Sequence, residues 1–74
     1  MTQQEIYQKC IEYGACVEAF INVSIVDAKN GEGHDDCMAA IMIGIENELI
    51  KSGVEIDWME RAKEVRKRIE VALA

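Results

Sequence analysis

The sequence lacks the features that mark a disordered or linker-rich chain. It has no proline among its 74 residues, no run of small polar residues and no long block of like charge. Only four residues are aromatic although half of the chain is hydrophobic, so Ile, Val, Ala and Met supply most of the apolar surface. This composition is typical of packed helices. We expect residues 1–74 to fold as a single helical domain.

Long apolar runs and secretion signals are also missing. The longest stretch without a charged residue spans 37–45, about half the length that a membrane-spanning helix needs. Met1 is followed by polar residues rather than by a basic and apolar leader, so we expect no signal peptide. The three cysteines are an odd number, which we interpret as thiols in a reducing compartment. We therefore expect a soluble, cytoplasmic protein.

Basic charge is scarce in most of the chain. Residues 1–57 carry eleven acidic against three basic side chains, a net charge of −8, whereas residues 58–74 carry three acidic against five basic ones, a net charge of +2. The acidic part disfavours binding to nucleic acid and to anionic membranes. We expect no nucleic acid and no membrane among the partners, and we expect a protein partner instead.

A long amphipathic helix is predicted at the start of the chain. Thr2 and Glu5 form a capping-box signal, and apolar residues then recur with the helical period. These signals predict a helix over 3–29. The alternation of Ile21, Val23 and Ile25 also fits a strand, but the sequence offers no obvious partner strand, so this reading is the alternative.

Two further helices follow, each preceded by a turn. Gly31 and the two aspartates at 35 and 36 suit a helix end and the next N-cap, which predicts a second helix over 36–52. Gly53 is expected to end that helix in a Schellman turn. Asp57 begins a third helix over 57–73, which has the most regular amphipathic pattern of the three.

The predicted fold is therefore all-α, a long helical hairpin plus a third amphipathic helix, in a three-helix bundle-like arrangement. The first helix is longer than the second. It must either bend near Gly14 or pack its first turns against the third helix or another chain. In both cases we expect Gly14 to mark a bend or a close approach.

The two helices of the predicted hairpin have apolar residues on more faces than a single chain can bury. Segments 13–28 and 37–45 are apolar nearly all round, and two packed helices hide only one stripe each. We therefore expect a homodimer or a higher homo-oligomer. Alternatively, the small residues in these segments simply fit a tight core. The predicted interface residues are Val17, Phe20, Ile21, Met38, Ile41, Met42, Ile43 and Ile45.

Metal chemistry is the most specific possibility that the residue types allow. Cys10, Cys16, His34 and Cys37 are residue types that bind zinc, but a continuous first helix would place Cys10 about 30 Å from the turn that holds His34. We therefore expect no metal site and no cofactor. A weaker alternative is a surface ion held by His34 with Asp35, Asp36 and Cys37.

No set of residues predicts catalysis. The only histidine lies in a turn, far in sequence from Ser24 and Ser52, so no nucleophile and base can be paired. Glu46 and Glu48 should point to different faces of the second helix, and the other carboxylates form solvated stripes. The basic cluster at 61–68 is interleaved with glutamates, which indicates a salt-bridged surface. Alternatively, this cluster pairs with the acidic surface of the first two helices in a neighbouring subunit.

The sequence thus predicts a non-enzymatic, acidic interaction protein that oligomerises and modulates a larger protein, in the manner of the compact accessory or inhibitor proteins that viruses and mobile elements encode. A first alternative is a small-molecule binder with its ligand enclosed between helices at a subunit interface. Its candidate contact residues are Tyr7, Tyr13, Asn22 and Trp58. A second alternative is a purely structural oligomerisation module.

Overall fold

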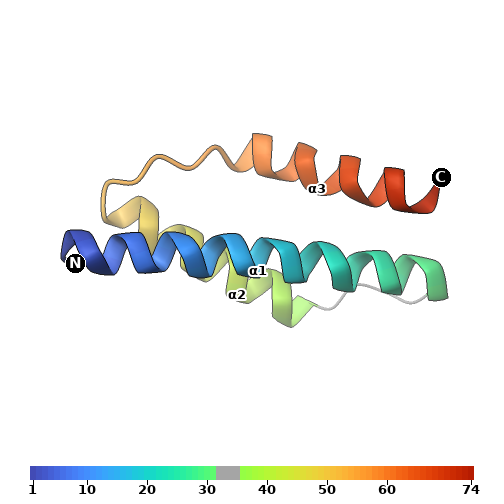
Figure 1. The fold of residues 1–74 in the computed structure, drawn as a ribbon, viewed down its shortest axis with the longest axis horizontal. Coiled ribbons are helices and arrows are strands. Elements are labelled where there is room, and N and C mark those ends of the chain that lie inside the picture. The colour runs from blue at the N-terminus through green and yellow to red at the C-terminus, as the bar shows by residue number, and fades with distance from the viewer. Residues whose placement is uncertain (32–35) are drawn as a thin grey trace.

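The computed structural model describes residues 1–31 and 36–74, and these form three α-helices (Figure 1). The helices are α1 (Gln3–Asn30), α2 (Asp36–Lys51) and α3 (Trp58–Leu73). The predicted all-α class is confirmed, and each helix end lies within one residue of its predicted position. The strand alternative for residues 21–25 is wrong because this segment lies inside α1.

The ends of α1 form as its local sequence predicts. The Thr2 side chain accepts a hydrogen bond from the Glu5 backbone N–H at 3.2 Å, and its hydroxyl donates to the Glu5 carboxylate at 3.0 Å. At the other end Gly31 has a φ of 71°, which a residue with a side chain rarely adopts. Its N–H donates to the Ala28 carbonyl at 3.3 Å and so caps the helix.

The turn between α2 and α3 also follows its sequence signals. Gly53 has a φ of 89°, and the Val54 N–H donates to the Leu49 carbonyl at 3.0 Å, which is the predicted Schellman geometry. The Asp57 carboxylate accepts from the N–H groups of Met59 and Glu60, both at 3.1 Å, and caps α3. The predicted N-cap of α2 at residue 35 or 36 falls outside the side chains that the structure describes.

Helix α1 is the spine of the molecule, because α2 and α3 each pack against it (Figure 1). Among the described residues, the backbones of α2 and α3 do not come within contact distance of each other. The molecule is elongated, with extents of 42 × 21 × 15 Å. Its apolar core is small: Ile21, Met42 and Leu49 are at most 2% exposed, and Val65 is 8% exposed.

The exposed surface is large for a chain of this size. The molecule exposes 5295 Å², whereas a compact monomer of the same mass exposes about 4,600 Å². Three helices joined through a single spine bury less area than a closed bundle in which every helix contacts both others. Much apolar surface therefore remains in contact with solvent.

Helix α1 continues through Gly14, and it extends beyond α2 at its C-terminal end, where α3 lies beside it (Figure 1). The expected bend is not needed, because α1 is a single helix over its whole length. The expected close approach is not found either: a Cβ atom added at Gly14 would meet no atom within 4 Å. The glycine thus has no packing role within the described part of the chain.

We predict that Gly14→Ala stabilises the chain by about 1 kcal/mol, because alanine costs less backbone entropy in a helix interior and meets no neighbour here. Urea unfolding followed by circular dichroism measures the change. Gly31→Ala is the matched control and should destabilise by about 1 kcal/mol, since its positive φ strains a residue with a side chain. A loss of stability in Gly14→Ala would contradict the open environment of this position.

Candidate functional site

A partly buried polar network joins the three helices. Tyr13 of α1 donates its hydroxyl to Glu46 of α2 at 2.6 Å. Arg61 of α3 donates to the same carboxylate from Nε at 3.1 Å and from Nη2 at 3.0 and 3.2 Å. The three side chains therefore tie α2 to α3, whose backbones do not contact each other directly.

The electrostatics of this network favour a neutral tyrosine and a charged arginine. Burial raises the pKa of Tyr13, and its hydrogen bond to the negative Glu46 adds to the increase. Burial acts to lower the pKa of Arg61, but its interactions with Tyr13 and Glu46 outweigh this effect and raise the pKa. Glu46 is only 6% exposed and depends on Arg61 for its counter-charge.

Sequence reasoning missed the role of Glu46 and expected the basic cluster to lie on the surface. A signal was available, because Glu46 is four residues after Met42 and three before Leu49, and so shares the buried face of α2. A carboxylate on such a face needs a basic partner. The only basic cluster of the chain, at 61–68, supplies it.

The basic cluster is used largely within the chain. Arg61 binds Glu46, and Arg68 binds Glu18 of α1 through two hydrogen bonds of 3.0 Å. The Arg68 guanidinium holds the pKa of the Glu18 carboxyl below its usual value through that contact. Arg68 thus forms an exposed salt bridge, as a salt-bridged surface predicts, whereas Arg61 is partly buried in the network. Both pairs form with the first two helices of the same molecule.

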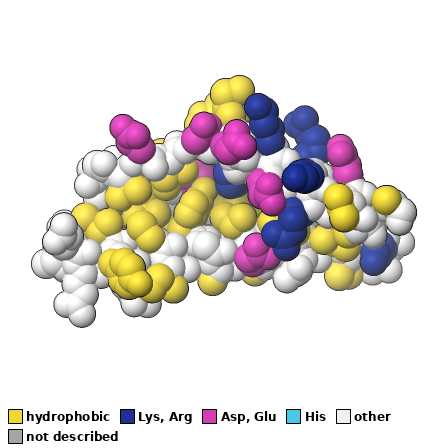
Figure 2. All heavy atoms as spheres, turned by 45° about the horizontal axis from the view of Figure 1, so that its top comes forward, with side chains coloured by type: hydrophobic (Ala, Val, Ile, Leu, Met, Phe, Trp, Pro, Cys, Tyr) yellow, Lys and Arg dark blue, Asp and Glu magenta, His cyan; other side chains and the backbone are white. Residues whose placement is uncertain are grey.

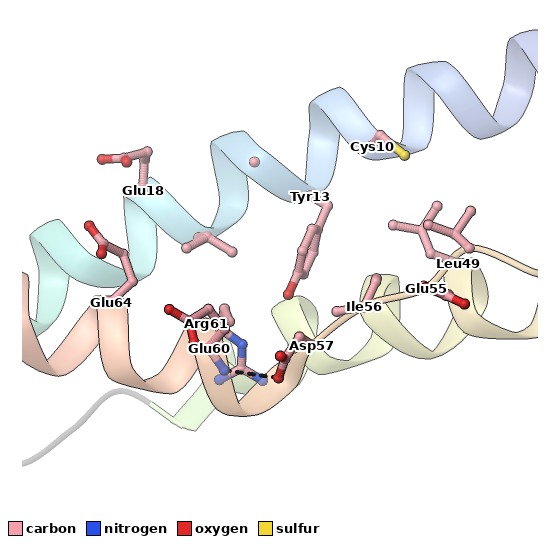
Figure 3. A pocket seen from close by; sticks show the side chains of 13 residues that line it. Cys10, Tyr13, Glu18, Leu49, Glu55, Ile56, Asp57, Glu60, Arg61 and Glu64 are labelled. Carbon is pink, nitrogen blue, oxygen red and sulfur yellow. Dashed lines mark hydrogen bonds between the residues drawn. The ribbon is translucent and has the colours of Figure 1, made fainter.

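A groove lies beside the network, between the N-terminal half of α1 and the segment that leads into α3 (Figure 3). It has a volume of about 620 Å³. Tyr13, Gly14 and Val17 line it from α1, while Val54 and Ile56 line it from the connecting segment. Figure 2 shows hydrophobic side chains spread over the N-terminal half of this face, bordered by acidic side chains.

Apart from Arg61, which is paired with Glu46, the charged residues that line the groove are acidic. Two of its carboxylates are already engaged, because Glu18 binds Arg68 and Asp57 caps α3. Glu55, Glu60 and Glu64 also line the groove and are exposed. Among the described residues, these three carboxylates form no hydrogen bond or close ion pair, although Glu64 interacts electrostatically with Arg68. Glu55 and Glu60 therefore remain available to a cationic group.

The four predicted ligand-binding residues do not come together. Tyr13 lines the groove and is half-buried. Tyr7 and Trp58 are 69% and 59% exposed and do not line it. Asn22 is exposed and lies beside a separate shallow pocket with Val26. Only Tyr13 of this set therefore belongs to the candidate site.

The predicted interface residues divide into three groups by exposure. Ile41 and Ile43 are 55% and 45% exposed and remain available for contact. Ile21 and Met42 must be corrected to core residues, because they are only 1% and 2% exposed and face the contact between α1 and α2. The half-buried members of the set are Val17, Phe20, Met38 and Ile45.

The described residues contain no group of three or more metal-ligating side chains close enough to hold an ion. The three cysteines are thiols rather than disulfides. The surface-ion alternative depends on His34 and Asp35, which lie outside the described residues. Within the same described part, no helix is long and apolar enough to cross a membrane.

We predict that Arg61→Leu lowers the free energy of unfolding by about 2–3 kcal/mol, because it leaves the Glu46 carboxylate buried without a counter-charge. The double variant Arg61→Leu with Glu46→Leu should recover most of that loss. Urea unfolding of the single and double variants measures the coupling. Arg68→Leu, which removes the solvent-exposed pair with Glu18, is the control and should cost under about 1 kcal/mol. Additive losses in the double variant would contradict the network.

The raised pKa of Tyr13 gives a prediction for alkaline pH. In the unfolded chain the pKa of Tyr13 lies near the ordinary tyrosine value of 10.0, so Tyr13 contributes its full stability below that pH. The contribution is lost as the pH rises through the higher pKa of the folded chain. In Tyr7→Phe only Tyr13 titrates, and its absorbance near 295 nm should change above pH 10.0 in the folded chain and near pH 10.0 in denaturant. Identical midpoints in the two states would contradict the hydrogen-bonded geometry.

No known family model, curated protein or solved structure matches the chain. Arguments about its function therefore come from its own groove, polar network and exposed surface.

Proposed function

We propose that the chain is a non-enzymatic interaction protein that self-associates and binds a larger protein, which it modulates as an accessory or inhibitor. The observation that carries the proposal is that more large apolar side chains are exposed to solvent than are buried. Of the side chains that the structure describes, eleven large apolar ones are 45–69% exposed, whereas four apolar ones are buried. Exposed apolar patches of this kind mark protein interaction sites in small domains.

The outer face of α2 is the proposed site of self-association. Ile43 and Ile50 are 45% and 47% exposed and lie seven residues, or two helical turns, apart. Ala40 and Asn47 fall on the same face and are exposed as well. The small side chain at position 40 allows a second helix to approach closely. A two-fold dimer would bring two copies of this face together.

The groove beside α1 and α3 is the proposed site for the larger partner. Helices α2 and α3 lie on different sides of α1 in Figure 1, so a dimer formed through the outer face of α2 leaves the groove open. Each two-fold contact covers one patch per subunit. A second apolar surface therefore favours a second binding partner.

The saturated polar network supports a role without catalysis. The Glu46 carboxylate accepts hydrogen bonds on both oxygens from Arg61 and a further one from Tyr13. A general base needs a free lone pair directed at its substrate. Glu46 is engaged in holding the helices together, and so the network is a structural element.

The size of the groove supports a second candidate function, the binding of a small molecule. Its volume of about 620 Å³ falls within the range of known ligand sites, and its walls are largely apolar. Against this candidate, the polar groups of Tyr13 and Glu18, which line the groove from α1, are already engaged with Glu46 and Arg68. A defined small molecule that stays with the purified chain in native mass spectrometry would favour this second function.

We predict that the wild-type chain has a solution mass of at least twice 8.3 kDa at micromolar concentration and that Ile43→Asp is monomeric. The aspartate places a charge in the centre of the proposed contact, and the exposed position leaves the core intact. Light scattering coupled to size exclusion measures the mass.

Val71→Asp is the matched control, since Val71 is 69% exposed on α3 and lies outside the α2 face. It should keep the wild-type mass. A monomeric wild type, or equal masses for wild type and Ile43→Asp, would overturn the proposed self-association. A chain that associates but captures no protein from a lysate would instead be a structural oligomerisation module.

A further inference from the structure

We infer that the groove between α1 and α3 binds a basic amphipathic helix presented by a different protein. This inference rests on the proposed function and names the chemistry of the partner. Such a helix would place apolar side chains on the floor of the groove and lysine or arginine side chains against its rim. The argument uses the floor, the glycine at its centre and the charges that surround it.

The floor of the groove is suited to apolar side chains. Val17, Val54 and Ile56 line it and are half-buried, so each still exposes part of its surface. The volume of about 620 Å³ exceeds that of one side chain and accommodates several from one face of a helix. Tyr7 and Ile11 lie one helical turn before lining residues on α1, and they are 69% and 50% exposed. The apolar surface thus continues beyond the groove along α1.

Gly14 keeps the centre of the groove open. A glycine in a helix interior costs about 1 kcal/mol relative to alanine. Within the described chain nothing approaches it, because an added Cβ would meet no atom within 4 Å. The cost is therefore not explained by packing inside the molecule. Close approach of another backbone to α1 at this point would explain it.

The rim determines the charge of the occupant. Glu55, Glu60 and Glu64 border the groove. Among the described residues the carboxylates of Glu55 and Glu60 form no hydrogen bond or ion pair, whereas Glu64 interacts electrostatically with Arg68. Glu60 and Glu64 lie four residues apart on α3, about 6 Å along its axis. Lysines or arginines one turn apart on a bound helix have the same spacing, so several ion pairs form in register. An acidic or neutral helix would gain no such pairs.

A second copy of this chain is a poorer occupant than a different protein. The only basic segment in the sequence is 61–68; Glu64 lies within it, and Glu60 and Glu70 flank it. Arg61 and Arg68 in that segment are already bound to Glu46 and Glu18. A copy of α3 would therefore bring its own carboxylates to an acidic rim, whereas an uninterrupted basic helix would not.

The probe for this inference is a synthetic helix of about 18 residues with leucine on one face and lysine on the other, long enough to form a stable helix on binding. Its counterpart with glutamate in place of lysine is the charge control. Fluorescence anisotropy of the labelled peptides measures binding to the full chain. We expect the lysine peptide to bind, its affinity to fall as salt increases, and the glutamate peptide not to bind.

Gly14→Leu is the decisive variant, since leucine favours the helix and fills the groove from its floor. We expect it to weaken binding of the lysine peptide by at least about tenfold, which corresponds to about 1.4 kcal/mol. Ala15→Leu adds the same bulk one residue further along α1, at an exposed position outside the groove, and should bind within about twofold of wild type. Glu60→Gln with Glu64→Gln changes only exposed carboxylates and should also weaken binding, which keeps the test valid if Gly14→Leu does not fold.

Equal binding by wild type, Gly14→Leu and the double glutamine variant would overturn the inference. Ile43→Asp separates it from the proposed self-association, because that variant should bind the lysine peptide as wild type does. If the wild type is dimeric but binds no peptide, the inference that the groove binds a basic helix is wrong, whereas the proposed self-association stands. A lysine peptide that merely dissociates the dimer, without sensitivity to Gly14→Leu, would show that the occupied surface is the α2 face and would likewise overturn the inference.

Discussion

The hydrogen-bonded ion pair between Glu46 and Arg61 is the interaction on which the arrangement of the helices depends. A carboxylate that is 6% exposed is unstable unless its counter-charge is present, and that counter-charge comes from a different helix. Tyr13 completes the network from α1. Replacing such a buried pair with apolar residues is often neutral for stability, so its main effect here is on geometry. It fixes the rotation of α2 and α3 about α1, because only one rotation brings the three side chains together.

The groove and the exposed surface both follow from this geometry. Helix α3 begins beside the middle of α1, so residues 52–57 must run along the N-terminal half of α1 to reach it (Figure 1). That segment packs less closely than a helix would, and the groove lies beneath it. The outer face of α2 is uncovered for a related reason: α3 packs against α1, and among the described residues its backbone does not approach α2, to which it is joined by the hydrogen bonds of Arg61. Among the described residues, no helix besides these three covers either surface.

The helices could be predicted from the sequence because their ends depend on local chemistry. Thr2 and Asp57 cap α1 and α3, and Gly31 and Gly53 end α1 and α2, each through contacts within five residues. The burial of individual residues could not be predicted in the same way. Segments that are apolar on every side do not reveal which side faces a neighbour, so Ile21 and Met42 were expected at an interface and are found in the core. The groove depends on where α3 docks along α1, which no local pattern determines.

The basic and acidic side chains of α3 lie on different sides of the helix. This arrangement explains why a chain with a basic segment still has an acidic groove. Arg61 and Arg68 turn toward α2 and α1 and neutralise Glu46 and Glu18. Glu60 and Glu64 fall on the flank that borders the groove, whereas Arg66 lies on the opposite flank, beside Phe20 and Ile69. The positive charge of the last helix is therefore partly used in folding and partly directed away from the groove. What remains at the groove is acidic charge beside an apolar floor, and a partner must bring the complementary pattern of both.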